Sequence, residues 1–152
     1  MGRHVLTRET IIARPRSEVF AFFADAGNLE RLTPPFLKFR ILTPQPIAMH
    51  EGTLIDYRIS LAGIPMKWRT RIEAWSPERE FVDTQLSGPY RYWHHTHTLE
   101  EMPDGRTRMR DRVVYEVPLG PLGSIARVLF VRRTLDAIFD YRTREIAKIF
   151  PG

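Results

Sequence analysis

The sequence of 152 residues contains no cysteine. Disulfide bonds, thiolate metal sites and a cysteine nucleophile are therefore excluded, and the composition fits a reducing compartment. Long apolar runs are also missing, because stretches such as 19-VFAFFA-24 are too short to span a bilayer. The first ten residues lack the apolar stretch of a signal peptide. Together these absences favour a soluble cytoplasmic protein.

Two further absences narrow the choice of function. The sequence contains no glycine-rich phosphate loop or dinucleotide fingerprint, and no G-x-S-x-G nucleophile motif. It also shows no internal repeat, low-complexity tract or linker. Hydrophobic residues make up 43% and charged residues 27% of the chain, which is the balance of a globular protein. Residues 1–152 are therefore predicted to form a single domain.

The net charge of +5 raises the question of a nucleic-acid partner. Basic residues alternate with other types along 67–71 and 108–112, which places them on one face of each predicted strand. RNA-binding sheets carry stacking aromatics on that same face, whereas most strand aromatics here fall on the opposite face. We therefore expect a solvated basic face and no nucleic-acid partner. Transient contact with an anionic membrane surface is compatible with such a face.

The order of the predicted elements is regular. A strand over 5–12 precedes a helix over 15–25 and a second short helix over 28–32, which 34-PP-35 ends. Strands separated by turn signals then follow at 37–43, 53–61, 65–75, 80–87, 90–101 and 106–117. After 118-PLGPLG-123, residues 124–150 show the apolar periodicity of a long helix.

This layout predicts an α+β fold. Short connections between strands indicate an antiparallel meander, and such a sheet needs one buried face. The long C-terminal helix is the main element available to cover that face. A curved sheet of about seven strands wrapped around one helix leaves space between them, and inward-facing residues would line that cavity.

The stretch 90-YRYWHHTHTLEE-101 carries the most distinctive polar residues. Alternation puts His95 and His97 on the same face as Trp93 and leaves His94 on the other, so the first two are predicted to face inward. A hairpin through 103-PDG-105 would bring Asp111 near both inward histidines. In 81-FVDTQL-86 the pattern does not decide which residues face inward.

Several segments resemble the SRPBCC superfamily, namely 88-GPYRYWHHTHTLE-100, 107-TRMRDRVVYEVPLGPLG-123 and 138-IFDYR-142. This superfamily has the helix-grip fold of START lipid-transfer domains and birch-pollen-allergen-like proteins. The chain is most similar to its small bacterial polyketide cyclase/dehydrase-like members. The resemblance implies an apolar ligand in a cavity between sheet and long helix, and it implies that Asp83 and Gln85 face that cavity.

The favoured hypothesis is the binding of a hydrophobic small molecule such as a lipid, a quinone or a polyketide-like aromatic. The expected binding residues combine an apolar wall with polar groups that orient a carbonyl or hydroxyl: Tyr57, Trp68, Asp83, Gln85, Trp93, His95, His97, Met109, Asp111, Val113, Tyr115, Leu135 and Ile138. The sequence is compatible with a monomer or a homodimer.

Two alternatives use the same polar cluster. An enzyme of cyclase/dehydratase or hydrolase type would employ His95 or His97 as general acid or base, with Asp111 or Asp83 as orienting group. A metal site would use the two histidines with Asp111 as third ligand. Two histidines alone are a weak metal signal and the resemblance does not call for metal, so we expect no metal and no other cofactor.

Overall fold

The computed structural model describes residues 2–118 and 124–152. Its elements, in chain order, are β1 (His4–Ile12), α1 (Arg16–Ala24), the 3-10 turn η1 (Ala26–Asn28), α2 (Leu29–Leu32), the 3-10 turn η2 (Pro35–Leu37), β2 (Arg40–Ile41), β3 (Leu54–Leu61), β4 (Ile64–Ser76), β5 (Glu80–Ser87), β6 (Tyr92–Glu101), β7 (Thr107–Glu116) and α3 (Ser124–Ile149). The predicted connection after Pro118 falls on 119–123, which lie outside the described residues.

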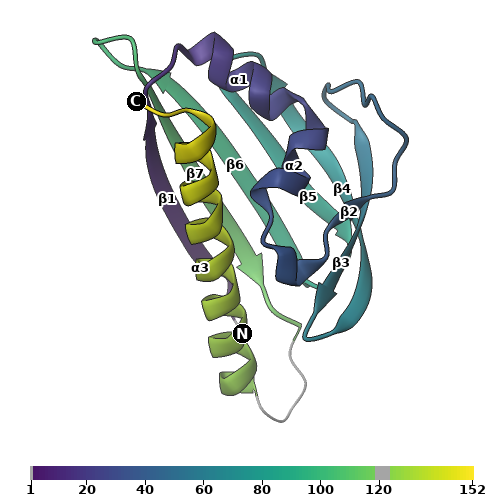
Figure 1. The fold of residues 1–152 in the computed structure, drawn as a ribbon. Helices are drawn as coiled ribbons and strands as arrows, with labels where there is room; N and C mark the ends of the chain where they lie inside the picture. The colour runs from purple at the N-terminus through teal and green to yellow at the C-terminus, as the bar shows by residue number, and fades with distance from the viewer. Residues whose placement is uncertain (1, 119–123) are drawn as a thin grey trace.

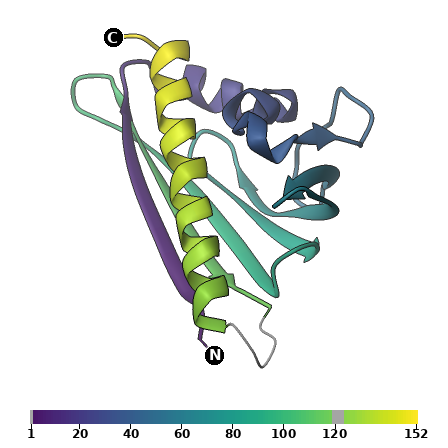
Figure 2. The ribbon, with the colours of Figure 1, turned by 60° about the horizontal axis from the view of Figure 1, so that its bottom comes forward.

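The seven strands form one antiparallel sheet in the order β1-β7-β6-β5-β4-β3-β2. Every strand from β2 to β7 pairs with its neighbour in sequence, as the short turns predict, and β1 closes the other edge against β7. The sheet curves around one helical layer: α3 lies along the β1 and β7 side, and α1 with α2 lies across the other strands (Figures 1 and 2). The α+β helix-grip fold is thereby confirmed.

One predicted strand is wrong over most of its length. Residues 37–43 were expected to be extended, but β2 contains only Arg40 and Ile41. Pro35 instead begins the 3-10 turn η2, because its fixed φ suits the first helical position. Lys38 then takes a left-handed conformation, with φ of 47°, and this reverses the chain before the strand begins. The shortened strand leaves the segment from Leu29 to Phe39 free to fold over the sheet.

The buried face of the sheet packs in two main regions. Near α1 the core joins Ile12, Val19 and Phe23 to Met109 and Ile146. Further along α3 a second cluster joins five hydrophobic residues from the sheet and the helix to Val117: Trp93, Val113, Tyr115, Leu135 and Phe139. The polar residues of β5, β6 and β7 lie between these regions, which places them inside the molecule.

The opposite face of the sheet carries the basic residues, as predicted. Arg108 and Arg110 each form ion pairs with Glu9 and Glu100, and Arg69 forms two hydrogen bonds with Asp56. These pairs explain the alternation of arginines as the solvated side of a one-sided sheet. Among the described residues, no helix combines the length and the apolar character needed to cross a membrane.

Candidate functional site

Three neighbouring strands bring the central polar residues together. In β6 the side chains of Trp93, His95 and His97 are buried, so the predicted inward face is confirmed. The register pairs His97 with Asp111 on β7 and His95 with Asp83 on β5. The expected proximity of Asp111 to both histidines is therefore confirmed as well.

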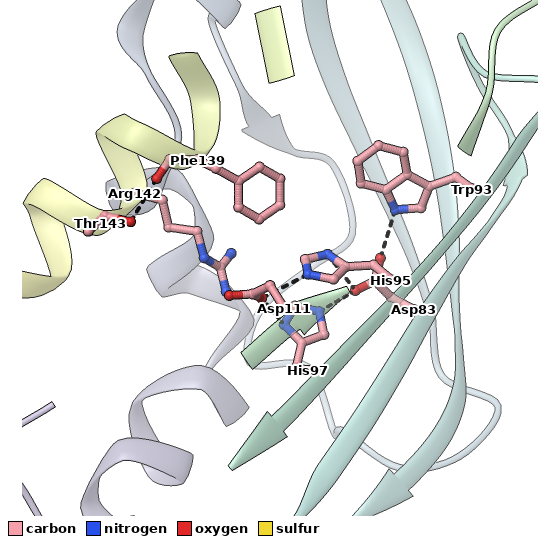
Figure 3. Close-up of polar contacts among 8 residues, drawn as sticks. All are labelled: Asp83, Trp93, His95, His97, Asp111, Phe139, Arg142 and Thr143. Atoms are coloured by element: carbon pink, nitrogen blue, oxygen red, sulfur yellow. Dashed lines mark hydrogen bonds and ion pairs between the residues drawn. The ribbon is translucent and has the colours of Figure 1, made fainter. Parts of the chain in front are cut away.

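The two carboxylates and two imidazoles form one connected network (Figure 3). His95 Nε2 lies 2.8 Å from Asp111 Oδ1, and His97 Nε2 lies 2.6 Å from Asp83 Oδ2. Trp93 Nε1 donates to the other oxygen of Asp83 at 3.2 Å. The imidazole rings stack with their centroids 3.6 Å apart, and Phe81 stacks on the far side of His97. Each ring is thus held in orientation by a carboxylate and by an aromatic or imidazole neighbour.

A cation from the covering helix completes the network. Arg142 on α3 places Nη2 at 3.6 Å from Asp111 Oδ1, and its side chain is 10% exposed. Its guanidinium carbon lies 5.2 Å from the ring centroid of Phe23 and 5.9 Å from that of Phe139. Asp111 Oδ1 therefore faces His95, His97 and Arg142 at once.

The carboxylates are held in their charged forms. Burial opposes the charge of Asp111, but the charge of Arg142 and the two neighbouring histidines outweigh it and hold the pKa of Asp111 well below its usual value. Burial likewise opposes the charge of Asp83, and the nearby histidines with Trp93 lower its pKa. Burial also raises the pKa of Tyr57, and the charge of Asp83 adds to that shift, so this phenol stays neutral.

The pKa values of the two histidines are shifted in opposite directions. Burial and the charge of the neighbouring His97 lower the pKa of His95, although Asp83 and Asp111 oppose this. Burial also acts against a charge on His97, but its contacts with Asp111 and Asp83 prevail and raise its pKa. The cluster therefore favours a charged His97 beside a neutral His95.

The network lies at the wall of a cavity of about 140 Å³ that is partly open to solvent. The residues that line it are Leu29, Leu32, Thr33, Leu37, Phe39, Tyr57, Ile59, Leu61, Trp68, Asp83, Tyr90, Trp93, His95, His97, Leu135, Ile138, Phe139 and Arg142. Most of these residues are apolar or aromatic, and the ionisable side chains of the network gather at one side. Apolar walls with a few convergent polar groups are typical of small-molecule sites.

Eight of the predicted binding residues line this cavity, namely Tyr57, Trp68, Asp83, Trp93, His95, His97, Leu135 and Ile138. The other five do not line it: Gln85, Met109, Asp111, Val113 and Tyr115. Met109, Val113 and Tyr115 face inward from β7, but they are buried in the core under α3. Asp111 lies behind the histidines, where it contacts their rings without lining the cavity.

Gln85 has a structural role that its position in the strand did not reveal. Its amide donates to the backbone oxygen of Tyr90 at 2.7 Å and accepts from the backbone nitrogen of Tyr90 at 3.0 Å. These bonds close the turn through Gly88, where φ is 155° and an added Cβ would lie 2.7 Å from Gln85 Oε1. Gln85 thereby positions Tyr90 in the cavity wall instead of facing the cavity itself.

Sequence reasoning missed Arg142 and the whole wall supplied by residues 29–39. It also missed four further lining residues, Ile59, Leu61, Tyr90 and Phe139. Arg142 falls at helical spacing from Leu135, Ile138 and Phe139, so a charged residue on the apolar stripe of α3 was the available signal. No comparable signal existed for 29–39, because that wall depends on the turn η2 that replaces the predicted strand.

The donor atoms of Asp83, His95 and His97 lie within 4.8 Å of one another, which raises the question of a metal centre. The imidazole planes, however, are inclined by only 26° and their centroids are 3.6 Å apart. Stacked rings with nearly parallel planes are poorly oriented to direct their in-plane lone pairs at one shared ion. The arrangement therefore favours a hydrogen-bonded network over a metal site.

Comparisons with known proteins agree with this architecture. Residues 12–139 match the family described as polyketide cyclase / dehydrase and lipid transport. A search of the curated proteins found no match. The chain is similar in structure to the Zhui aromatase/cyclase from Streptomyces sp. R1128, with a TM-score of 0.74, 16% identity, and coverage of 95% of this chain and 92% of that one.

Two other solved structures share the fold across different organisms. A START superfamily protein from Mycobacterium smegmatis has a TM-score of 0.68 at 13% identity, covering 96% of this chain and 99% of that one. The major latex-like protein 151 from Panax ginseng has a TM-score of 0.69 at 12% identity, covering 99% of both chains. At such low identity these similarities establish the fold alone.

Proposed function

The chain belongs to the polyketide cyclase / dehydrase and lipid transport family, and from this premise we propose that it binds a hydrophobic small molecule in the cavity between the sheet and α3. The observation that carries the proposal is the composition of the cavity wall, which is apolar and aromatic except for one polar side. Such a wall favours an apolar ligand body and orients a single polar group.

The size of the cavity limits the ligand. Cavities of about 150 Å³ accommodate a benzene ring, so a volume of about 140 Å³ fits a body of roughly one aromatic ring. Leu29, Leu37 and Phe39 contribute to the wall from the segment that crosses the sheet. A larger lipid or polyketide-like ligand would therefore extend through the open side of the cavity or displace this segment outward.

Native mass spectrometry of untagged protein tests the proposal, with the denatured mass as reference. We expect wild-type protein to retain a small organic molecule, and Ile138→Trp to retain none because the indole fills the cavity. Leu129→Trp is the matched control, since Leu129 is an exposed residue of the same helix that does not line the cavity. Equal retention by wild-type and Ile138→Trp protein would place the ligand elsewhere and refute the proposal.

A catalytic role is the second candidate, and the opposite pKa shifts of His95 and His97 favour it. Two adjacent groups driven apart in pKa can act as a base and an acid in one reaction. In the dehydration of a β-hydroxy ketone, neutral His95 would accept the proton on the carbon next to the carbonyl. Charged His97 would give its proton to the departing hydroxyl, so that water and an unsaturated ketone form.

The dehydration of 4-hydroxy-4-phenylbutan-2-one, followed by the ultraviolet absorbance of its conjugated product, tests this candidate. An enzyme would accelerate the reaction over buffer and lose that acceleration in the double variant His95→Gln, His97→Gln. Equal rates for the wild-type and double-variant proteins would leave binding as the role of the cavity.

A further inference from the structure

Arg142 is a charged residue on a helix face that otherwise packs apolar side chains against the sheet. It lies on the face of α3 that covers the sheet, its residue is 8% exposed, and it lines the cavity. The rings of Phe23 and Phe139 flank its guanidinium group. Since a guanidinium stays protonated at any ordinary pH, this position keeps a permanent positive charge out of water.

The hydrogen-bond donors of this group are not satisfied by the protein. In the part of the chain that the structure describes, neither Nε nor Nη2 of Arg142 has a hydrogen-bond partner, although both atoms are buried. Asp111 Oδ1, at 3.6 Å from Nη2, is too distant for a hydrogen bond. That oxygen lies closer to His95 Nε2, at 2.8 Å, and to His97 Nδ1, at 3.3 Å.

A second unsatisfied donor lies nearby. His97 Nδ1 is buried and also lacks a hydrogen-bond partner among the described residues. A buried charged group without hydrogen bonds is strongly unfavourable, so an oxygen acceptor supplied by a ligand would be stabilised beside Arg142. The planar guanidinium fork matches the two oxygens of a carboxylate in bidentate geometry.

We propose that the ligand is an aromatic carboxylic acid, with its carboxylate on Arg142 and its ring against the aromatic wall of the cavity. The inference rests on the proposed binding function and specifies the class of ligand. Trp68 and Trp93 provide the wall, with ring centroids 5.1 Å apart, together with Tyr57, whose centroid is 6.3 Å from that of Trp68.

The placement of the protein's own carboxylates fits an anion at Arg142. Figure 3 shows both histidines between Arg142 and Asp83, so the like charge of Asp83 lies at the far end of the network. Asp111 is nearer, with Oδ1 at 3.6 Å from Arg142 Nη2, but it does not line the cavity. The ligand carboxylate therefore meets Arg142 at the end of the network remote from Asp83.

Isothermal titration calorimetry with two matched probes tests the inference. The probes are 3-phenylpropanoate and 3-phenylpropan-1-ol, which share a one-ring body and differ in the acidic group. For wild-type protein we expect the acid to bind at least about tenfold more tightly than the alcohol, because only the acid forms charge-assisted hydrogen bonds to Arg142.

Variants of α3 assign the effect to one residue. Arg142→Met keeps the approximate length of the side chain and removes its charge. It should lower the affinity for the acid by about tenfold or more and leave the affinity for the alcohol within about twofold of wild type. Arg144→Met is the matched control, because Arg144 is an exposed arginine of the same helix outside the cavity wall. It should leave both affinities within about twofold of wild type.

The outcomes separate this inference from the function on which it rests. Equal affinity of wild-type protein for the acid and the alcohol would overturn the inference while leaving the binding function intact. Equal weakening of both probes by Arg142→Met would do the same, because it would assign Arg142 a structural role. Binding of neither probe to wild-type protein would overturn both. If Arg142→Met does not fold, the inference is tested by the affinities of wild-type protein and of Arg142→Lys. Lysine keeps the positive charge but lacks the planar guanidinium group, so this variant should bind the acid with intermediate affinity.

Discussion

Asp111 is the residue that the other members of the polar network share. Its side chain is 5% exposed, and its Oδ1 atom faces two imidazoles and one guanidinium. Replacing it with asparagine would remove this carboxylate from beside the buried charge of Arg142, and that change is more unfavourable than the loss of a surface ion pair.

We therefore expect Asp111→Asn to lower the free energy of unfolding at pH 7 by about 3 kcal/mol, measured by urea denaturation. Asp104→Asn is the control, because Asp104 forms an exposed ion pair with Arg106 and should be dispensable. A variant at Asp111 as stable as this control would show that the network contributes little to the fold.

The depressed pKa of Asp111 also predicts how stability depends on acid. A carboxyl whose pKa is lower in the folded state contributes stability above its unfolded pKa, and that contribution is lost as the pH falls through the folded value. Wild-type stability should therefore drop below about pH 4, and Asp111→Asn should show a shallower drop. If the free energy of unfolding falls equally steeply with pH in both proteins, the lowered pKa of Asp111 is contradicted.

The two histidines should titrate on opposite sides of the ordinary histidine pKa. His97, with its raised pKa, stabilises the fold fully below the unfolded value of 6.5, and this contribution is lost as the pH rises through the folded pKa. His95, with its lowered pKa, destabilises the fold as the pH falls below 6.5. NMR titration of the imidazole resonances, assigned with His95→Gln, measures both values. If both histidines titrate at the ordinary pKa, the electrostatic effect of the network on them is contradicted.

At the scale of elements, the turn between β5 and β6 links strand geometry to the cavity wall. Gln85 fixes the backbone of Tyr90, and Gly88 fits beside the Gln85 amide only because it has no Cβ. This arrangement explains why the turn needs both residues.

A double-mutant cycle tests this coupling by urea denaturation. Gly88→Ala should destabilise the fold by about 1–3 kcal/mol through overpacking, and Gln85→Ala by about 1 kcal/mol through lost hydrogen bonds. The double variant should lose less than the sum, because removal of the Gln85 side chain also removes the clash. Strictly additive losses would mean that the two residues act independently.

The elements also show where sequence patterns succeed and where they fail. Alternation in β6 and β7 predicted the burial of His95, His97 and Asp111, because a strand with one buried face leaves no other register. The same rule could not place Asp83 and Gln85, since Phe81 and Val82 are both buried beside a register shift in the pairing of β4 with β5. Distances within the network depend on three strands at once and are not encoded in any local pattern.

At the scale of the whole molecule, an exposed apolar patch lies outside the cavity. It consists of Phe36 from η2 with Ile125, Leu129 and Phe130 from α3, which are 44–77% exposed, and Arg133 lies beside it. An exposed apolar patch beside a positive charge suits an anionic lipid surface. We propose that this patch contacts membranes during ligand exchange.

Vesicle sedimentation tests the contact. Wild-type protein should sediment with vesicles containing phosphatidylglycerol more than with pure phosphatidylcholine vesicles, and high salt should reduce the difference. The double variant Leu129→Ser, Phe130→Ser should remain in the supernatant. Sedimentation unaffected by either the lipid charge or the variant would contradict a role for the patch.

The cavity between sheet and helix is the central feature of the molecule, and intermolecular NMR contacts test its role most directly. With methyl-labelled protein and 3-phenylpropanoate, we predict nuclear Overhauser effects from the ligand ring to Ile59, Leu135 and Ile138, which line the cavity. Effects only to the exposed methyl groups of Ile125 and Leu129, or none at all, would contradict binding inside the fold.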